Sequence, residues 1–310
     1  MAGISPEAPH RPGVVIGIIF NPTARGDKAR QFRAHLAELG PDVRVLPTAG
    51  PGHARTLAAT LAAEGFATIT AAGGDGTVNE VLNGLAETPG GLERCRLAVI
   101  PLGTVNVFAK ETGIPTGFHR AWSVIQAGRE RLIDLPQAEF SDADGNLETR
   151  YFILMAGAGL GARAIERVDW ELKKRFGPLA YVWAGCQAMR PPHPKVTVEF
   201  DGTRHRAPLI EVGAGRFFGG RFVLFPGAHL EDGQLGVTLL TKLTWLSLIR
   251  LGCRVVLRQL RTNSETVVRR TQLVKLSCPT PMPLHLDGDL VGHLPATLTI
   301  RQRALRVLVP

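Results

Sequence analysis

The stretch from Ala71 to Gly84 (AAGGDGTVNEVLNG) constrains the fold more than any other part of the chain, because a strand pattern changes there into a helical pattern across a glycine-rich turn. The segment Phe66–Ala72 (FATITAA) is short, apolar and partly β-branched, which is typical of a strand buried on both faces. Apolar residues then recur at helical spacing, at Val78, Val81, Leu82 and Leu85. The pattern therefore predicts a strand, a glycine turn and a helix in direct succession.

The glycine turn is suited to binding phosphate. Gly73, Gly74 and Gly76 remove three Cβ atoms at the predicted helix start, so backbone N–H groups can approach an anion closely. Asp75 would repel phosphate oxygens unless a cation lies between them, and a Mg²⁺-nucleotide meets that requirement. The alternative is an ordinary glycine-rich turn in which Asp75 and Thr77 cap the helix.

The same strand, turn and helix pattern occurs three more times before residue 134. Strands are predicted at Val14–Phe20, Asp42–Leu46 and Arg96–Ile100, and the turns after them are Asn21–Gly26, Thr48 and Gly103–Thr104. This alternation predicts an α/β fold with a doubly wound parallel sheet, in which all of these turns share one edge where ligands bind. Each turn taken alone is also explained by ordinary turn chemistry.

The rest of the chain has a different pattern, in which short strands are separated by turn residues. Strands are predicted at 151–156, 195–200, 209–213, 236–240, 267–276 and 296–309, and helices at 162–175 and 244–261. A length of 310 residues with 45% hydrophobic residues is enough for two cores. We therefore expect a nucleotide-binding α/β domain over residues 12–134 and a β-rich, sandwich-like domain over residues 135–310, with the last strand available to pack back on the first domain.

Positive charge is concentrated in the second half of the chain. The net charge is +9, made up of −2 over residues 1–160 and +11 over residues 161–310, so an anionic partner should meet the second half. The predicted helix Thr244–Arg261 carries an arginine every three or four residues beside Trp245 and several aliphatic residues. Such a helix can lie on an anionic membrane surface. The alternative is a packed helix with an arginine face in solvent.

Nothing in the sequence predicts export or a membrane span. The segment Met1–Arg11 has no apolar stretch suited to a signal peptide, and no run of about 18 uncharged apolar residues occurs. The four cysteines are scattered without a CxxC pair, which argues against a zinc site or a disulfide framework built from them. We expect a cytoplasmic protein that associates peripherally with the inner membrane face, and the sequence leaves the oligomeric state open.

Two acidic clusters stand out in the second half. Glu231-Asp232-Gly233 is explained by a hairpin turn, or by a metal site in which the Asp232 carboxylate and main-chain oxygens bind a hard cation. In HLDGD, residues 285–289, a hairpin at Asp287-Gly288 is the simplest interpretation. The alternative is an extended segment in which His285, Asp287 and Asp289 share one face and bind a metal. Asp289 or Asp287 could also accept the proton of an alcohol as its oxygen attacks a phosphoryl group.

Five segments, in this order, resemble the diacylglycerol kinase catalytic-domain family, which includes sphingosine kinases and soluble bacterial lipid kinases. They are Asn21-Pro22-Thr23 with Gly26, GGDGTVNEVLNGL at 73–85, PLGTVNVFA at 101–109, LEDG at 230–233 and HLDGD at 285–289. The resemblance extends from residue 14 to residue 310. The GGDG segment alone is also similar to NAD kinases, whereas the combination is specific to the lipid kinases.

The resemblance implies an enzyme that uses ATP and Mg²⁺, with its active site between an α/β domain and a β-rich domain. Matching positions for the nucleotide are Asn21, Pro22, Thr23, Ala24, Arg25, Gly26, Thr48, Gly73, Gly74, Asp75, Gly76, Thr77, Val78, Asn79, Glu80, Gly103, Thr104 and Asn106. Asp289 resembles the proton acceptor, with Asp287 beside it and Asp75 near the Mg²⁺ of the nucleotide. Asp232, with backbone oxygens near His229 and Gln234, resembles a structural Mg²⁺ site of bacterial members.

Three positions depart from the family pattern. Asp289 stands where glutamate is usual, Val107 stands where many members have aspartate, and Arg25 is inserted before Gly26 and could add a phosphate donor.

The predicted function is therefore transfer of the ATP γ-phosphate to a hydroxyl group of a diacylglycerol- or sphingoid-like lipid. The first alternative is a kinase for a soluble substrate, as the similarity to NAD kinases allows. A second is a nucleotide-binding regulator that contacts nucleic acid. We do not expect a nucleic-acid partner, because the sequence contains no recognition motif for one.

Overall fold

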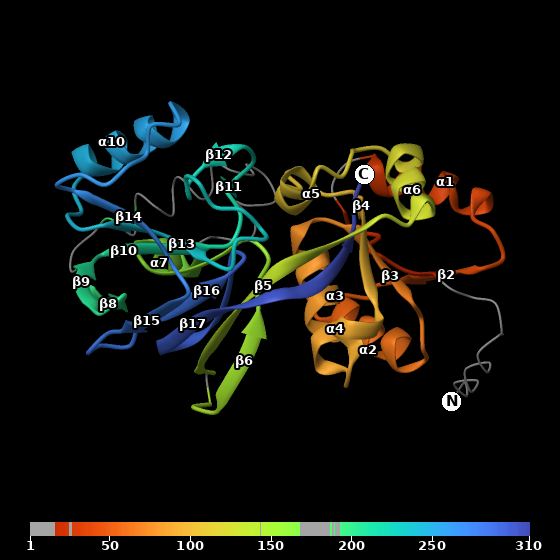
Figure 1. Ribbon diagram of the computed structural model, residues 1–310, viewed down its shortest axis with the longest axis horizontal. Helices are drawn as coiled ribbons and strands as arrows, with labels where there is room; N and C mark the ends of the chain where they lie inside the picture. The colour runs from red at the N-terminus through yellow and green to blue at the C-terminus, as the bar shows by residue number, and fades with distance from the viewer. Residues whose placement is uncertain (1–15, 25–26, 143, 168–186, 188, 190–192) are drawn as a thin grey trace. The chain divides into compact units, whose positions relative to one another are not determined.

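The computed structural model describes residues 16–24, 27–142, 144–167, 187, 189 and 193–310, which form two compact units (Figure 1). The first unit contains the described residues up to Thr104, together with Ile114–Arg131 and Arg306–Pro310. The second unit contains Val105–Gly113 and Leu132–Leu305. Arg25, Gly26 and most of the helix predicted at 162–175 lie outside the described residues.

The first unit is an α/β structure with a parallel sheet. Its strands are β1 (Ile16–Phe20), β2 (Val43–Pro47), β3 (Thr68–Gly73) and β4 (Arg96–Pro101), in the order β4-β3-β1-β2. Its helices are α1 (Lys28–Ala34), the 3₁₀ helix η1 (Leu36–Glu38), α2 (His53–Ala63), α3 (Asp75–Glu87), α4 (Gly91–Arg94) and α6 (Phe118–Ala127). Phe20 pairs with Pro47 and Ala72, and Gly73 pairs with Pro101, so all four strands end at one edge of the sheet. The predicted doubly wound parallel sheet is confirmed.

Helices cover both faces of this sheet because successive side chains of a strand point to opposite faces. On one face, Gly17 of β1 leaves room for the Leu61 side chain of α2. On the other face, Ile18 belongs to a buried cluster with Phe32 of α1 and Phe118 of α6. The sheet is therefore enclosed between two helical layers, and its open edge carries the turns.

One helix predicted in the first unit is interrupted. The helix expected after the turn Asn21–Gly26 ends at Ala34, and His35, with φ −93° and ψ 0°, separates α1 from η1. The helix α6 follows Gly117, and its apolar residues Phe118, Ala121, Val124 and Ile125 are buried. That helical spacing is visible in the sequence, although we did not predict the helix.

The second unit is β-rich, as predicted. Its strands are β5 (Glu130–Ser141), which begins in the first unit, β6 (Leu147–Tyr151), β7 (Met155–Gly159), β8 (Val196–Phe200), β9 (Thr203–Ala207), β10 (Leu209–Gly213), β11 (Phe217–Phe218), β12 (Phe222–Val223), β13 (Leu235–Leu240), β14 (Thr266–Thr271), β15 (Leu273–Ser277), β16 (Pro283–Leu286) and β17 (Asp289–Leu308). Its helices include α5 (Val107–Thr112), α7 (Leu160–Glu166) and α10 (Trp245–Val256). Neighbouring strands in the series β14-β13-β10-β7-β16-β17 are antiparallel and bury a large apolar core.

Two strands predicted in the second unit are wrong in extent. The strand expected at 151–156 is divided into β6 and β7, because the N–H groups of Ile153 and Leu154 are hydrogen-bonded to a side chain, the Asp287 carboxylate. The strand expected at 267–276 is divided at Gln272 into β14 and β15, which pair with different strands. Pairing between distant segments, which local patterns do not show, causes both divisions.

Candidate functional site

Three of the predicted turns are joined directly at the edge of the first-unit sheet. The Asn21 side chain, after β1, donates from Nδ2 to Oγ1 of Thr77 in α3 at 3.3 Å. Its Oδ1 accepts hydrogen bonds from the backbone N–H and the hydroxyl of Thr23, at 2.9 and 2.8 Å. The carbonyl of Gly73, at the end of β3, accepts the N–H groups of Leu102 and Gly103 after β4, at 2.9 and 3.3 Å. The turns after β1, β3 and β4 therefore form one connected site.

The fourth turn is held by Glu80 of α3. The N–H of Thr48 donates to the carbonyl of Phe20 at 2.8 Å, which keeps this residue beside the end of β1. The carboxylate oxygens of Glu80 accept the N–H groups of Gly52 and Ala54 at 2.9 and 3.0 Å, where α2 begins. The structure thus gives Glu80, predicted to contact the nucleotide, the role of positioning the segment that follows Thr48.

The three glycines of the turn differ in what the protein requires of them. A Cβ on Gly73 would collide with the Thr77 side chain, and one on Gly74 would lie 3.3 Å from the Gly103 Cα. Among the residues that the structure describes, none has an atom within 4 Å of a Cβ built on Gly76, which is exposed in the first turn of α3. Close packing explains Gly73 and Gly74, whereas the described residues give no such explanation for Gly76.

Lys28 belongs to the site, although we did not predict it from the sequence. It is the first residue of α1, and its Nζ donates to the carbonyl of Gly103 at 2.7 Å. A cation at the beginning of a helix is unfavourable with the helix dipole. A lysine at the first position of a helix could therefore have pointed to Lys28 from the sequence, because such a lysine does not stabilise its own helix.

Four other residues predicted to contact the nucleotide have mixed surroundings. Asp75 lies partly exposed in the first turn of α3, next to Gly76. Val78 is buried, and its N–H donates to the carbonyl of Gly74 at 3.1 Å. The side chain of Asn79 accepts a hydrogen bond from Asn83 at 3.1 Å. Asn106, in the second unit, is buried with φ 51° at the beginning of α5.

In the second unit, Asp287 fixes a hairpin that presents Asp289. Asp287 and Gly288, with φ 51° and 93°, form the two-residue turn between β16 and β17, as the simplest interpretation of HLDGD predicted. The Asp287 carboxylate accepts the N–H groups of Ile153, Leu154 and Met155 at 2.8, 2.8 and 2.9 Å. Asp289 is exposed at the first position of β17.

The predicted metal residue Asp232 is already bound by other groups. Its oxygens accept the N–H groups of His229 and Gln234 at 2.8 and 3.0 Å, and Oδ2 forms an ion pair with the Arg270 guanidinium. A Mg²⁺ ion would have to displace the Arg270 guanidinium from Oδ2 or share the carboxylate with it, because Arg270 already supplies a positive charge there. In this arrangement Arg270 is the counter-charge of Asp232, in place of the structural cation that the family resemblance implied.

The ion pair between Asp232 and Arg270 leads to a prediction about the thermal stability of the protein. We expect the melting temperature of the protein to be unchanged by EDTA or by millimolar MgCl₂. Arg270→Gln should cost about 1 kcal/mol, a few degrees in melting temperature, because the pair is only partly buried. It should also make the melting temperature rise with MgCl₂. Arg269→Gln on the same strand is the matched control, and a wild-type protein that is destabilised by EDTA would contradict the prediction.

Comparison with known proteins covers almost the whole chain. Residues 16–138 match the family model "Diacylglycerol kinase catalytic domain", and residues 155–309 match "YegS C-terminal NAD kinase beta sandwich-like domain". A curated diacylglycerol kinase of Bacillus subtilis (strain 168) is 31% identical over 304 residues, which are 94% of this chain and 95% of the relative.

Solved structures show the same fold. A crystal structure of a protein from Bacillus anthracis str. Sterne superposes with a TM-score of 0.75 at 23% identity, covering 96% of this chain and 98% of that one. Yeast NADH kinase complexed with NADH has a TM-score of 0.52 at 12% identity, covering 96% and 84%. The fold of this chain is thus also that of yeast NADH kinase.

Proposed function

Since this chain belongs to the diacylglycerol kinase catalytic-domain family, we propose that it is an ATP-dependent kinase that phosphorylates a hydroxyl group of a diacylglycerol- or sphingoid-like lipid. The observation that carries the proposal is the connected set of turns at the sheet edge, in which Gly76 is open and backbone N–H groups begin α3. Such an arrangement can bind a chain of phosphates without large movements, because main-chain donors are already in place.

The residues at this edge fit an ATP molecule. Asn21 holds the Thr77 hydroxyl, and Lys28 adds a positive charge beside Gly103. Bound with ATP, Mg²⁺ would neutralise phosphate oxygens, and Asp75 is the residue that we propose to hold it. Phosphoryl transfer needs no covalent intermediate with the protein. These residues therefore contribute to catalysis by positioning the ATP and by neutralising the charge of its phosphates.

We assign proton transfer to Asp289. As the lipid hydroxyl oxygen forms a bond to the γ-phosphorus, the bond from that phosphorus to the ADP oxygen breaks, and the hydroxyl proton passes to the Asp289 carboxylate. Asp287 is a positioning residue, because its three backbone hydrogen bonds fix the hairpin from which Asp289 extends.

The test is incubation of the purified chain with γ-labelled ATP, Mg²⁺ and a total lipid extract, followed by mass spectrometry of the products. Separate reactions contain diacylglycerol, sphingosine or NAD. Label in a lipid phosphate supports the proposal and identifies the lipid. Label in NAD alone would establish the alternative of a soluble substrate, which the fold shared with yeast NADH kinase keeps open, and no label in any product would refute both.

Lys28 provides a test of the nucleotide site. Lys28→Met should raise the KM for ATP about tenfold, since a charge-assisted contact contributes about 1.5–3 kcal/mol. Arg30→Met is the control, because Arg30 lies on the same helix and its guanidinium pairs with the exposed Asp27. Steady-state kinetics with ATP as the varied substrate measures both. An unchanged KM in Lys28→Met would remove Lys28 from the site.

We also propose that α10 binds an anionic membrane surface. Trp245, Leu246 and Ile249 are 55%, 54% and 61% exposed, and Val256 and Leu257 are exposed at its other end. Arg250, Arg254 and Arg258 lie among them, so apolar side chains could enter the lipid while guanidinium groups meet phosphates. In the parts of the chain that the structure describes, no helix is both long enough and apolar enough to cross a bilayer.

The double variant Trp245→Ala/Ile249→Ser tests this surface. It should weaken binding to vesicles that contain phosphatidylglycerol at least about tenfold, because each apolar side chain contributes about 1.5–3 kcal/mol when buried. Vesicle co-sedimentation measures the effect. Leu147→Ser, at an 80% exposed position on β6, is the control. Equal binding of the wild type and the double variant would show that α10 does not meet the membrane.

A further inference from the structure

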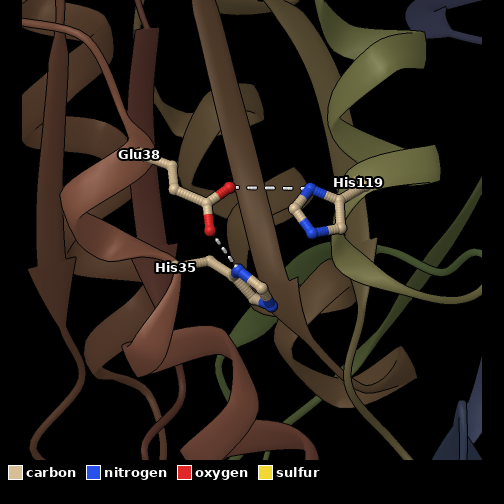
Figure 2. Close-up of side chains that lie close together, drawn as sticks. All are labelled: His35, Glu38 and His119. Atoms are coloured by element: carbon tan, nitrogen blue, oxygen red, sulfur yellow. Dashed lines mark hydrogen bonds and ion pairs between the residues drawn. The ribbon is translucent and has the colours of Figure 1, made fainter.

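Three side chains of types that can bind metal ions meet on the first unit, away from the residues that we propose to bind the nucleotide. His35 lies between α1 and η1, Glu38 ends η1, and His119 lies in the first turn of α6 (Figure 2). Lys28 and His35 are seven residues apart along α1, which corresponds to about 10 Å of helix. The three side chains therefore form a group at the end of α1 opposite to the proposed ATP site.

Their donor atoms are close enough to share one ion. Nδ1 of His35 lies 2.6 Å from Oε1 of Glu38, and Nδ1 of His119 lies 3.6 Å from Oε2 of the same carboxylate. One ligand atom from each of the three residues lies within 4.8 Å of the other two. In a tetrahedral zinc site with bonds of about 2.0–2.1 Å, ligand atoms are about 3.4 Å apart. One of the two nitrogen–oxygen distances is shorter than this value and the other is longer. Small side-chain rotations are therefore enough to bring the three ligand atoms to the spacing of a zinc site.

Aromatic packing holds both imidazoles in orientation. The His35 ring stacks on Phe118 with centroids 4.7 Å apart and an interplanar angle of 1°. The His119 ring meets Phe118 and His35 edge-on, at 5.3 and 4.6 Å. Phe118 in turn stacks on Trp122. Ligands restrained before binding lose less conformational entropy when the metal arrives.

The break between α1 and η1 is part of this arrangement. In a continuous helix His35 and Glu38, three positions apart, would also be neighbours. Here the chain at His35 has left helical geometry, and the two side chains are in direct contact. His119 lies 81 residues after Glu38 in the sequence. A metal bound here would thus join η1 to α6.

We propose that His35, Glu38 and His119 form a Zn²⁺ site that fastens η1 to α6, with water at the fourth position. Two imidazole nitrogens and one carboxylate oxygen are ligands that suit Zn²⁺ rather than Mg²⁺ or Ca²⁺, which prefer oxygen alone. Both histidines bind through Nδ1, so each ring carries its hydrogen on Nε2. The proposal is independent of which substrate the protein phosphorylates.

The experiment uses untagged, metal-free protein. Isothermal titration calorimetry measures the binding of ZnCl₂, and visible absorption spectroscopy follows a titration with Co²⁺. We expect one Zn²⁺ per chain and the visible absorption of tetrahedral Co²⁺. His119→Gln should weaken Zn²⁺ binding at least about tenfold and abolish that absorption, since one of three ligands is lost. Its side chain is 68% exposed, so the variant should fold normally.

Two further variants complete the design. Glu38→Gln should also weaken binding, whereas His293→Gln, at an exposed histidine of β17 in the second unit, should bind Zn²⁺ as the wild type does. Melting curves of the metal-free variants confirm that each is folded. Absence of saturable binding by the wild type, or equal affinity in wild type and His119→Gln, would overturn the proposal.

Discussion

Asp289→Asn is expected to reduce lipid phosphorylation by about 10²–10⁴-fold, the usual contribution of a positioned general base. Asparagine keeps the shape of the side chain but cannot accept the hydroxyl proton. Asp289 is exposed at the beginning of β17, so the melting temperature should not change. Initial rates with saturating ATP and lipid measure the effect, together with a melting curve.

Asp289→Glu is the matched control, because it keeps the carboxylate and introduces the residue that is usual at this position in the family. It should retain most of the activity. If Asp289→Asn turned over lipid at nearly the wild-type rate, Asp289 would not be the proton acceptor. If Asp289→Glu were as inactive as Asp289→Asn, the position would matter for its geometry rather than for its basicity.

Gly76→Ala is expected to change stability and nucleotide use in opposite directions. Alanine in place of glycine stabilises a helix by about 0.4–1 kcal/mol where the backbone allows it, and the space around Gly76 is open. The added methyl group would stand where we propose that phosphate approaches the backbone. The kcat/KM for ATP should therefore fall about 10²-fold or more, which corresponds to losing roughly one strong backbone contact.

The control for this substitution is Gly40→Ala, which lies in the first unit, outside the turns proposed to bind the nucleotide, and which also has no described atom within 4 Å of an added Cβ. It should leave kcat/KM unchanged. Thermal unfolding and steady-state kinetics on the same preparations decide the outcome. A Gly76→Ala enzyme with normal kcat/KM for ATP would show that the glycine turn is ordinary helix capping.

Local patterns were sufficient to predict the first-unit sheet. Buried strands such as Ile16–Phe20 are continuous apolar runs, and each is followed by a turn with a clear residue signature. The second unit was predicted less well because its strand limits depend on distant partners. The Asp287 carboxylate, for example, takes three N–H groups from the segment where we expected an unbroken strand.

In the candidate site too, features that lie within one short segment could be predicted, whereas contacts between residues distant in the sequence could not. The glycine turn and the Asp287-Gly288 hairpin follow from short segments of sequence. The contacts of Lys28 with Gly103, of Glu80 with Gly52 and of Arg270 with Asp232 join residues 75, 28 and 38 positions apart. Residue type alone cannot reveal such pairs, since a lysine, a glutamate and an arginine also occur widely on exposed surfaces.

The way β17 ends has a consequence for how the protein is made. Val307 pairs with Leu97 of β4, the N–H of Val309 donates to the carbonyl of Arg129, and Arg306 binds Glu130. Val307 and Leu308 are completely buried in the first unit. During synthesis the amino-terminal sheet must therefore wait, with one edge uncovered, until residue 309 has left the ribosome. The first unit can thus be completed only after the residues of the second unit have been synthesised.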